Sequence, residues 1–218
     1  MDVQSLPSTS NIPEGMEPSL RAMATGARKQ HYPKGAVIVQ EGDADTDFYI
    51  LLKGSVKAYS NDLDGREVTY AVYRSPDYFG EMILDGGVRS ASILALESTE
   101  CAVMHVDLLS AILRRDPDFA LHLLKRMISR SRSIIASARS MALDSAYERL
   151  ARMLVQMSGG EAANGPREIL GVSHLDLANW IGSSREMVTR LLNDLERGGY
   201  VETAVRRIVL KQKLPARW

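Results

Sequence analysis

The spacing of apolar residues divides the chain into a strand-rich first half and a helix-rich second half. In the first half the apolar residues come in short runs, several with the period-two alternation typical of half-buried strands. These runs cover residues 36–39, 48–52, 56–58, 68–72, 93–96 and 102–106. Pro, Gly, Asn and Asp cluster between them as turn formers. The pattern predicts an antiparallel barrel or jelly roll over residues 21–115.

A helical period begins at Asp116-Pro117, where a capping Asp precedes a Pro at the first helical position. A long stretch without Pro or Gly follows. Small and apolar residues recur there at steps of four and three, at Ala120, Leu124, Met127, Ser131, Ile134, Ala138 and Met141. This heptad seam predicts that residues 116–143 form a dimerisation helix. The alternative is an amphipathic helix packed on its own domain.

Residues 144–218 are predicted to form a winged helix-turn-helix domain, which makes the fold class α+β. Ser173 caps a first helix, Gly182 supplies a tight turn, and Ser184 caps a second helix that runs to about Glu196. The segment from Tyr200 to Lys211 follows Gly198-Gly199 and is predicted to form the hairpin wing.

The second helix of this motif has one polar face. At ~100° per residue, its polar side chains from Arg185 to Arg190 span about 140°, opposite the apolar side. Arg donates two bonds to guanine, and a carboxylate accepts from cytosine N4. We therefore predict that Arg185, Glu186 and Arg190 read bases. The other predicted DNA-binding residues are Ser184, Thr189, Arg206 and Arg207. The alternative is a solvated face with a Glu186–Arg190 ion pair.

Charge distribution supports a nucleic-acid partner for the second half. The net charge of the 218 residues is zero, but residues 1–115 hold 11 basic against 16 acidic residues, whereas residues 116–218 hold 16 against 11. The basic half is the candidate for contact with phosphates of double-stranded DNA.

Several classes of function are disfavoured. A single cysteine, Cys101, allows no intramolecular disulfide and suits a reducing cytoplasm. No apolar run reaches the ~18 residues that a membrane span needs, and the Pro- and Ser-containing residues 1–20 resemble a disordered tail. No HExxH, GxSxG or P-loop motif is present and the four histidines are scattered, so we expect neither an enzyme nor a metal site.

The segment from Gly182 to Arg190, GSSREMVTR, resembles the recognition helix of the catabolite activator and fumarate-nitrate regulator superfamily. The resemblance extends upstream through Phe79-Gly80-Glu81 and Arg89-Ser90-Ala91, and it covers residues from about 21 to 211. It implies a cyclic-nucleotide-binding roll, a homodimer and a palindromic site with TGTGA-like halves. It also implies RNA polymerase as a partner.

The resemblance also implies where an effector binds. Gly80, Glu81, Arg89 and Ser90 match the positions that hold the ribose and the cyclic phosphate in that family. Alignment from the two ends places either Ser133-Ile134 or Ile134-Ile135 where cAMP-responsive members have a Thr-Ser pair, so at most one of the two hydroxyls is kept. The interval from Glu81 to Arg89 is also shorter than in typical members.

We therefore expect a non-covalent cyclic nucleotide effector, with cAMP favoured over cyclic di-GMP, and keep open a pocket without a ligand or a haem sensor. A nucleotide-sensing regulatory subunit that acts on a protein partner is the alternative from another class. It would have no use for the arginines of the second helix.

Overall fold

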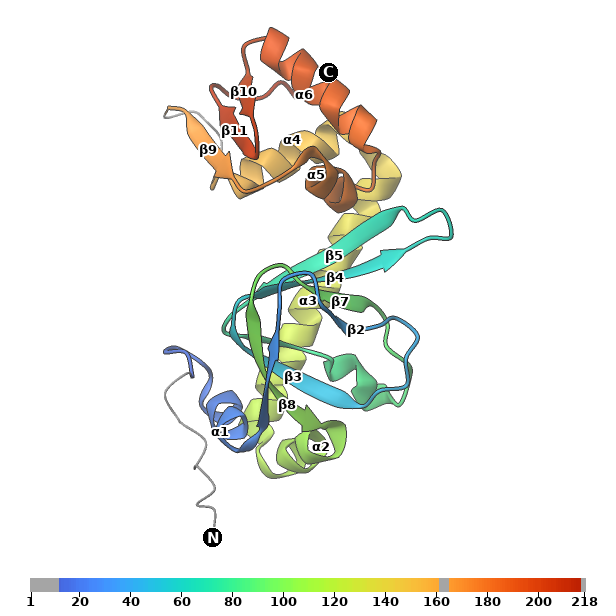
Figure 1. Ribbon diagram of the computed structural model, residues 1–218, viewed down its shortest axis with the longest axis vertical. Helices are drawn as coiled ribbons and strands as arrows, with labels where there is room; N and C mark the ends of the chain where they lie inside the picture. The colour runs from blue at the N-terminus through green and yellow to red at the C-terminus, as the bar shows by residue number, and fades with distance from the viewer. Residues whose placement is uncertain (1–11, 161–164, 217–218) are drawn as a thin grey trace. The chain divides into compact units, whose positions relative to one another are not determined.

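The computed structural model describes residues 12–160 and 165–216 (Figure 1). The chain forms two compact units. One comprises the residues up to Ser60 together with Thr69–Ile128, and the other comprises Asn61–Val68 together with the residues from Ser129 onward. The long helix α3 (Pro117–Leu143) is divided between the units rather than forming a segment of its own.

Two antiparallel four-stranded sheets form the first unit, as the alternation of apolar residues predicts. One has the order β1 (Arg28–Tyr32), β8 (Thr99–His105), β3 (Asp47–Lys53), β6 (Asp77–Phe79). The other has the order β2 (Val37–Val39), β7 (Ser92–Ala95), β4 (Ser55–Asn61), β5 (Glu67–Arg74). The sequence pattern missed β1 and β6, since β1 is mostly polar and β6 has only three residues.

The central strand β3 is buried on both faces, which explains its unbroken apolar run. Tyr49 and Leu51 pack between the two sheets. Phe48 and Ile50 point the other way, into a second core. That core is closed by residues from α1 (Pro18–Gly26), α2 (Val106–Arg115) and the start of α3.

Helix α1 corrects the predicted disordered tail of residues 1–20. Met16 and Leu20 are buried in the core that lies against β3, and α1 begins at Pro18. Pro18 is compatible with a helix because its missing N–H lies in the first turn. Residues 1–11 lie outside the described residues. At the other end of the roll, Val106 begins α2 instead of ending the last strand.

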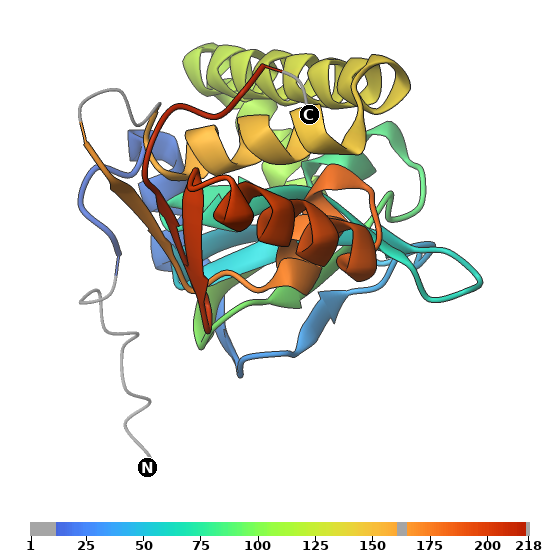
Figure 2. The ribbon, with the colours of Figure 1, turned by 90° about the horizontal axis from the view of Figure 1, so that it is seen from above.

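The second unit contains a winged helix-turn-helix, as predicted. Its helices are α4 (Ala146–Met157), α5 (His174–Ile181) and α6 (Arg185–Arg197). They pack on a sheet with the order β10 (Val201–Ala204), β11 (Arg207–Leu210), β9 (Arg167–Leu170) (Figure 2). The sequence predicted the β10–β11 hairpin but missed β9, whose nearest pair with β11 joins Leu170 to Arg207, 37 positions further along the chain.

Helix α3 is anchored over its first turns and again near its C-terminal end, where Ser140 Oγ accepts from Arg152 Nη1 at 2.9 Å. Phe119 and Leu123 are buried, and Arg126 Nη2 lies 2.7 Å from Asp77 Oδ1. Every residue from 131 to 139 is exposed, and so are Leu124 and Met141. None of the described helices, α3 included, is long and apolar enough to cross a membrane.

Candidate DNA-reading face and effector site

The turn before α6 fixes where the recognition helix begins. Gly182 has φ of 59°, a left-handed conformation that suits glycine. The Ser183 N–H donates to the Ala178 carbonyl at 3.0 Å. Ser184 then caps α6, because its Oγ accepts from the Met187 N–H at 3.2 Å. The turn thus joins α5 and α6 in the predicted helix-turn-helix.

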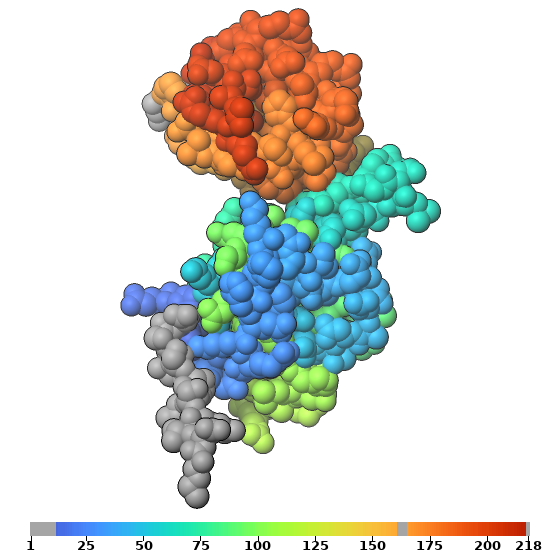
Figure 3. All heavy atoms as spheres, in the orientation of Figure 1, coloured from blue at the N-terminus to red at the C-terminus, as the bar shows by residue number. Residues whose placement is uncertain are grey.

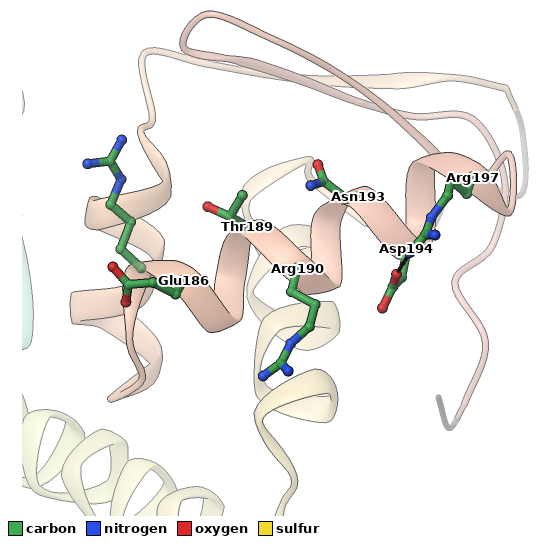
Figure 4. A pocket seen from close by; sticks show the side chains of 7 residues that line it. Glu186, Thr189, Arg190, Asn193, Asp194 and Arg197 are labelled. Atoms are coloured by element: carbon green, nitrogen blue, oxygen red, sulfur yellow. Dashed lines mark hydrogen bonds and ion pairs between the residues drawn. The ribbon is translucent and has the colours of Figure 1, made fainter.

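Burial of one side of α6 leaves the other side open. Val188, Leu192 and Leu195 are fully buried in the core of the second unit. The opposite side carries a hollow of about 400 Å³ (Figure 4). It is lined by Arg185, Glu186, Thr189, Arg190, Asn193, Asp194 and Arg197. Together with the wing, α6 forms a large part of the surface of this unit in Figure 3.

The predicted ion pair between Glu186 and Arg190 does not form among the described residues. Hydrogen bonds from the backbone N–H of Glu186 and from the Ser184 side chain, together with the charge of Arg185, lower the pKa of Glu186. Arg190 Nη2 instead lies 3.2 Å from the sulfur of Met187. Both charges therefore stay on the open face, so the alternative of an internally paired surface loses its support.

A histidine that the sequence analysis did not select orients one residue of this face. The Nδ1 of His174, the first residue of α5, lies 2.9 Å from Thr189 Oγ1. Burial and the nearby charge of Arg185 lower the pKa of His174. Only the packing of α5 on α6 brings the two side chains together, so no local sequence signal marks the pair.

The two wing arginines have different surroundings. Arg206 stands at the hairpin turn with φ of 54°, and its Nη2 donates to the Gly171 carbonyl at 2.9 Å. Arg207 forms ion pairs with Glu168 and Glu202, which raise its pKa. Arg206 Nη2 also lies 4.0 Å from Asp176 Oδ2, so Arg206 is the less tightly paired of the two. A DNA contact by either stays a prediction.

The predicted effector residues Gly80 and Arg89 lie together in the roll. Arg89 is 5% exposed, and its Nη1 lies 3.3 Å from the Gly80 carbonyl oxygen. Gly80 has φ of 87°, and a Cβ there would lie 2.9 Å from that Nη1, so glycine is required on both counts. The Nε of Arg89 is buried and has no hydrogen-bond partner within the described residues.

An aspartate that the sequence analysis did not select completes this cluster. Asp45 Oδ2 accepts from Arg89 Nη2 at 2.6 Å, and the Asp47 carbonyl accepts from the same nitrogen at 2.5 Å. Burial raises the pKa of Asp45, but hydrogen bonds from Arg89, the Asp47 N–H and Tyr49, together with the charge of Arg89, outweigh burial and lower that pKa. The Arg89 N–H also donates to the Asp43 carbonyl at 2.8 Å.

The remaining predicted effector residues are placed less directly. Glu81 is buried and begins the short 3₁₀ helix η2 (Glu81–Asp85). Ser90 Oγ lies 3.2 Å from the sulfur of Met82. Ser133 and Ile134 are exposed on the part of α3 that belongs to the second unit. Their contact with an effector stays a prediction.

These features define a class of protein. A winged helix-turn-helix with an open polar recognition face is built to bind DNA, and the buried arginine beside Gly80 suits an anionic small molecule. The described residues contain no group of three or more His, Cys, Asp or Glu side chains placed to hold a metal ion. The chain therefore combines a sensor roll with a DNA-binding domain.

Comparisons with known proteins agree with that class. The model of the cyclic nucleotide-binding domain matches residues 29–116, and the model of the Crp-like helix-turn-helix domain matches residues 148–213. The chain belongs to the CRP-like transcription regulators, which bind DNA and are not enzymes.

Individual relatives cover most of the chain. The cyclic AMP receptor protein of Thermus thermophilus is 31% identical over 175 residues, which span 80% of this chain and 79% of that protein. The global nitrogen regulator of a Synechocystis strain is 30% identical over 185 residues, with 82% of each chain covered. The structure of a c-di-GMP responsive regulator from Xanthomonas campestris, 22% identical, has a TM-score of 0.79 and covers 90% of this chain and 100% of its own.

Proposed function

We propose that the protein is a homodimer that binds palindromic DNA and is controlled by a cyclic nucleotide. The DNA-binding part of this proposal is carried by the open face of α6. Arg185 and Arg190 can donate hydrogen bonds to the edge of a guanine. Glu186 can accept a hydrogen bond from the edge of a cytosine. We expect Ser184, Thr189 and Arg206 to fix the helix and the wing on the DNA backbone.

Dimerisation is supported by the exposed seam of α3. Leu124, Ile134 and Met141 belong to the predicted heptad seam and are 54%, 58% and 43% exposed. Residues 131–139 are exposed on all sides of the helix, so packing within the same chain stabilises this segment little. The heptad spacing favours a second copy of α3 as the partner that covers the seam. Two copies related by a twofold axis would place two α6 helices in major grooves about one helical turn apart.

The effector is proposed from Arg89. An unpaired buried N–H costs about 1–3 kcal/mol, and the exocyclic phosphate oxygens of a cyclic nucleotide are charged acceptors for it. We favour cAMP, the ligand named for the relative at 31% identity. Cyclic di-GMP is the alternative, and Arg130 and Arg132 on α3 are the residues that we would expect to bind its guanines or phosphates.

Selection of DNA fragments from a random pool tests the DNA-binding proposal. We expect the selected fragments to share an inverted repeat with TGTGA-like halves. Enrichment of a single, non-repeated motif would contradict the homodimer, and no enrichment would contradict sequence-specific binding. RNA polymerase is the protein partner that we expect at such a site, and the cytoplasm is where a regulator of this kind acts.

Calorimetric titration with cAMP and with cyclic di-GMP tests the effector. We expect saturable binding of cAMP that the Arg89→Gln variant loses, since the neutral amide removes the charge that neutralises the phosphate. Binding of cyclic di-GMP alone would replace cAMP as the effector. Absence of heat with both ligands would overturn the cyclic nucleotide proposal.

A further inference from the structure

The guanidinium of Arg89 already has an anionic partner. Asp45 Oδ2 lies 2.6 Å from Arg89 Nη2, and the Arg89 side chain is 4% exposed against 38% for that of Asp45. Tyr49 supports the same pair, because its hydroxyl lies 3.4 Å from Asp45 Oδ2 and its ring lies beneath the guanidinium, 5.8 Å from centroid to Cζ. A carboxylate thus occupies one of the nitrogens that a phosphate would bind.

The charges around this pair are unfavourable for a second anion. Arg89 and Arg28 are the cations of the cluster, and Arg28 lies 3.8 Å from the Asp47 carboxylate. Asp45 and Asp47 are its acidic residues. Two cations and two carboxylates cancel, so the cluster offers no net positive charge to a further anion. A phosphate must therefore either displace Asp45 from Arg89 or bind beside it.

Backbone contacts connect the position of Asp45 to that of Arg89. The Gly42 N–H donates to the Arg89 carbonyl at 2.9 Å, and the Arg89 N–H donates to the Asp43 carbonyl at 2.8 Å. The Asp47 N–H in turn donates to Asp45 Oδ1 at 2.9 Å. The carboxylate is therefore held in place by its own loop, and its release changes contacts along residues 42–47.

We propose that Asp45 is an internal competitor of the effector, a carboxylate that occupies Arg89 in the free protein and sets the concentration of anionic ligand needed to replace it. The proposal rests on the proposed binding of a cyclic nucleotide at Arg89. It assigns a specificity role as well. A ligand with two phosphates meets the repulsion of Asp45 more strongly than a ligand with one, so Asp45 favours a singly charged cyclic nucleotide.

Titration of the Asp45→Asn variant with cAMP and with cyclic di-GMP tests this role in the full-length protein. The amide keeps the shape of the side chain and removes its charge. We expect affinity for cAMP to rise about tenfold or more, the size of effect of a like charge within ~4–6 Å. We expect a larger rise for cyclic di-GMP and a smaller difference between variant and wild type at high salt.

Asp43→Asn is the matched control, because it removes a charge from the same loop. The bond between Asp43 and Arg89 is formed by the backbone carbonyl of Asp43. The affinity of this variant should stay within about twofold of the wild type, because the substitution keeps that backbone carbonyl. Thermal unfolding without ligand gives a second readout, and Asp45→Asn should lower the Tm because Arg89 loses its counter-ion.

The outcomes separate this role from the effector proposal. If the wild type binds a nucleotide and Asp45→Asn binds it equally or more weakly, the competitor role is overturned and the effector stands. An equal gain in Asp43→Asn would also overturn it, because the effect would then be general electrostatics of the loop. If neither protein binds either nucleotide, the effector proposal and the competitor role both fail.

Discussion

At the scale of single residues, the α6 side chains divide into those that we propose to read bases and those that hold the helix in position. Arg185 and Arg190 are on the open face, whereas Glu186 also bonds to the capping Ser184. Substitution of Glu186 would thus disturb the cap together with any base contact. Arg185 is the cleaner probe of base reading.

Replacing Arg185 with Ala should weaken binding to the selected operator by roughly 1–3 kcal/mol and relax the preference at one base pair. Fluorescence anisotropy against the operator and its single-base variants measures both effects. Arg206→Ala is the matched control. It should lower affinity for all sequences alike and reduce the salt dependence. An Arg185→Ala protein with unchanged sequence preference would show that this side chain does not read a base.

His174 predicts a pH dependence of DNA binding and of stability. Burial and Arg185 hold the pKa of His174 below its ordinary value, so the unfolded chain takes up this proton first as the pH falls. The contribution of His174 to stability is therefore lost as the pH drops below about 6.5 and through the lower pKa of the folded state. DNA phosphates favour the protonated imidazole. A falling pH should therefore strengthen DNA binding while it weakens the stability of the fold.

The DNA affinity of the wild type should accordingly rise as the pH is lowered below about 6.5, because the pKa of His174 in the free protein lies below its ordinary value. The variant His174→Asn keeps a polar group next to Thr189 without titrating in this range, and its profile should be flatter. The other histidines are the same in both proteins and serve as the internal control. Identical profiles would exclude His174 as the group responsible.

At the scale of elements, helix caps fix the geometry of the helix-turn-helix. Ser173 and Asp176 form a capping box at the start of α5, in which Ser173 Oγ accepts from the Asp176 N–H at 3.1 Å. The side chain of Asp176 accepts in turn from the Ser173 N–H at 2.8 Å. Two N–H groups at this helix end are thus satisfied by local side chains.

We expect Ser173→Ala to reduce the free energy of unfolding of the second unit by about 1 kcal/mol, the usual value of an N-terminal cap. Urea unfolding followed by circular dichroism measures this loss. Ser183→Ala is the control because its position is in the turn and its backbone N–H, which the substitution keeps, makes the bond to Ala178. Equal losses in the two variants would contradict a specific capping role.

At the scale of the whole molecule, the proposed recognition of a palindrome requires a second copy of the chain. The roll and the winged helix-turn-helix each have their own core, and the seam of α3 is left exposed between Leu124 and Met141. A single α6 reads only one half of a palindrome. The oligomeric state is therefore the property that links this surface to function.

A charge placed on the seam should separate the dimer. The double variant Leu124→Glu and Ile134→Glu should elute as a monomer in light-scattering chromatography, because an uncompensated charge in an apolar helix interface is costly. It should bind a full palindrome no better than one half-site. Lys125→Glu introduces the same side chain off the seam and should remain dimeric. A dimeric double variant would place the interface elsewhere.

The sequence by itself determined the features that depend on local periodicity and local chemistry. The alternation of short apolar runs defined the roll, and the caps at Ser173 and Ser184 with Gly182 between them defined the helix-turn-helix. The polar face of α6 followed from residues close together in the chain. The helical period alone was enough to place Arg185, Glu186, Thr189 and Arg190 on one side.

Only the tertiary structure decided which distant residues act on those features. Asp45 meets Arg89 across 44 positions, and His174 meets Thr189 across 15. Composition indicated a disordered tail, but helix α1 covers a sheet face. Burial of Met16 and Leu20 in the core stabilises this arrangement, and the prolines of the segment do not prevent it. Such contacts depend on chain segments brought together by packing, and no window of neighbouring residues contains them.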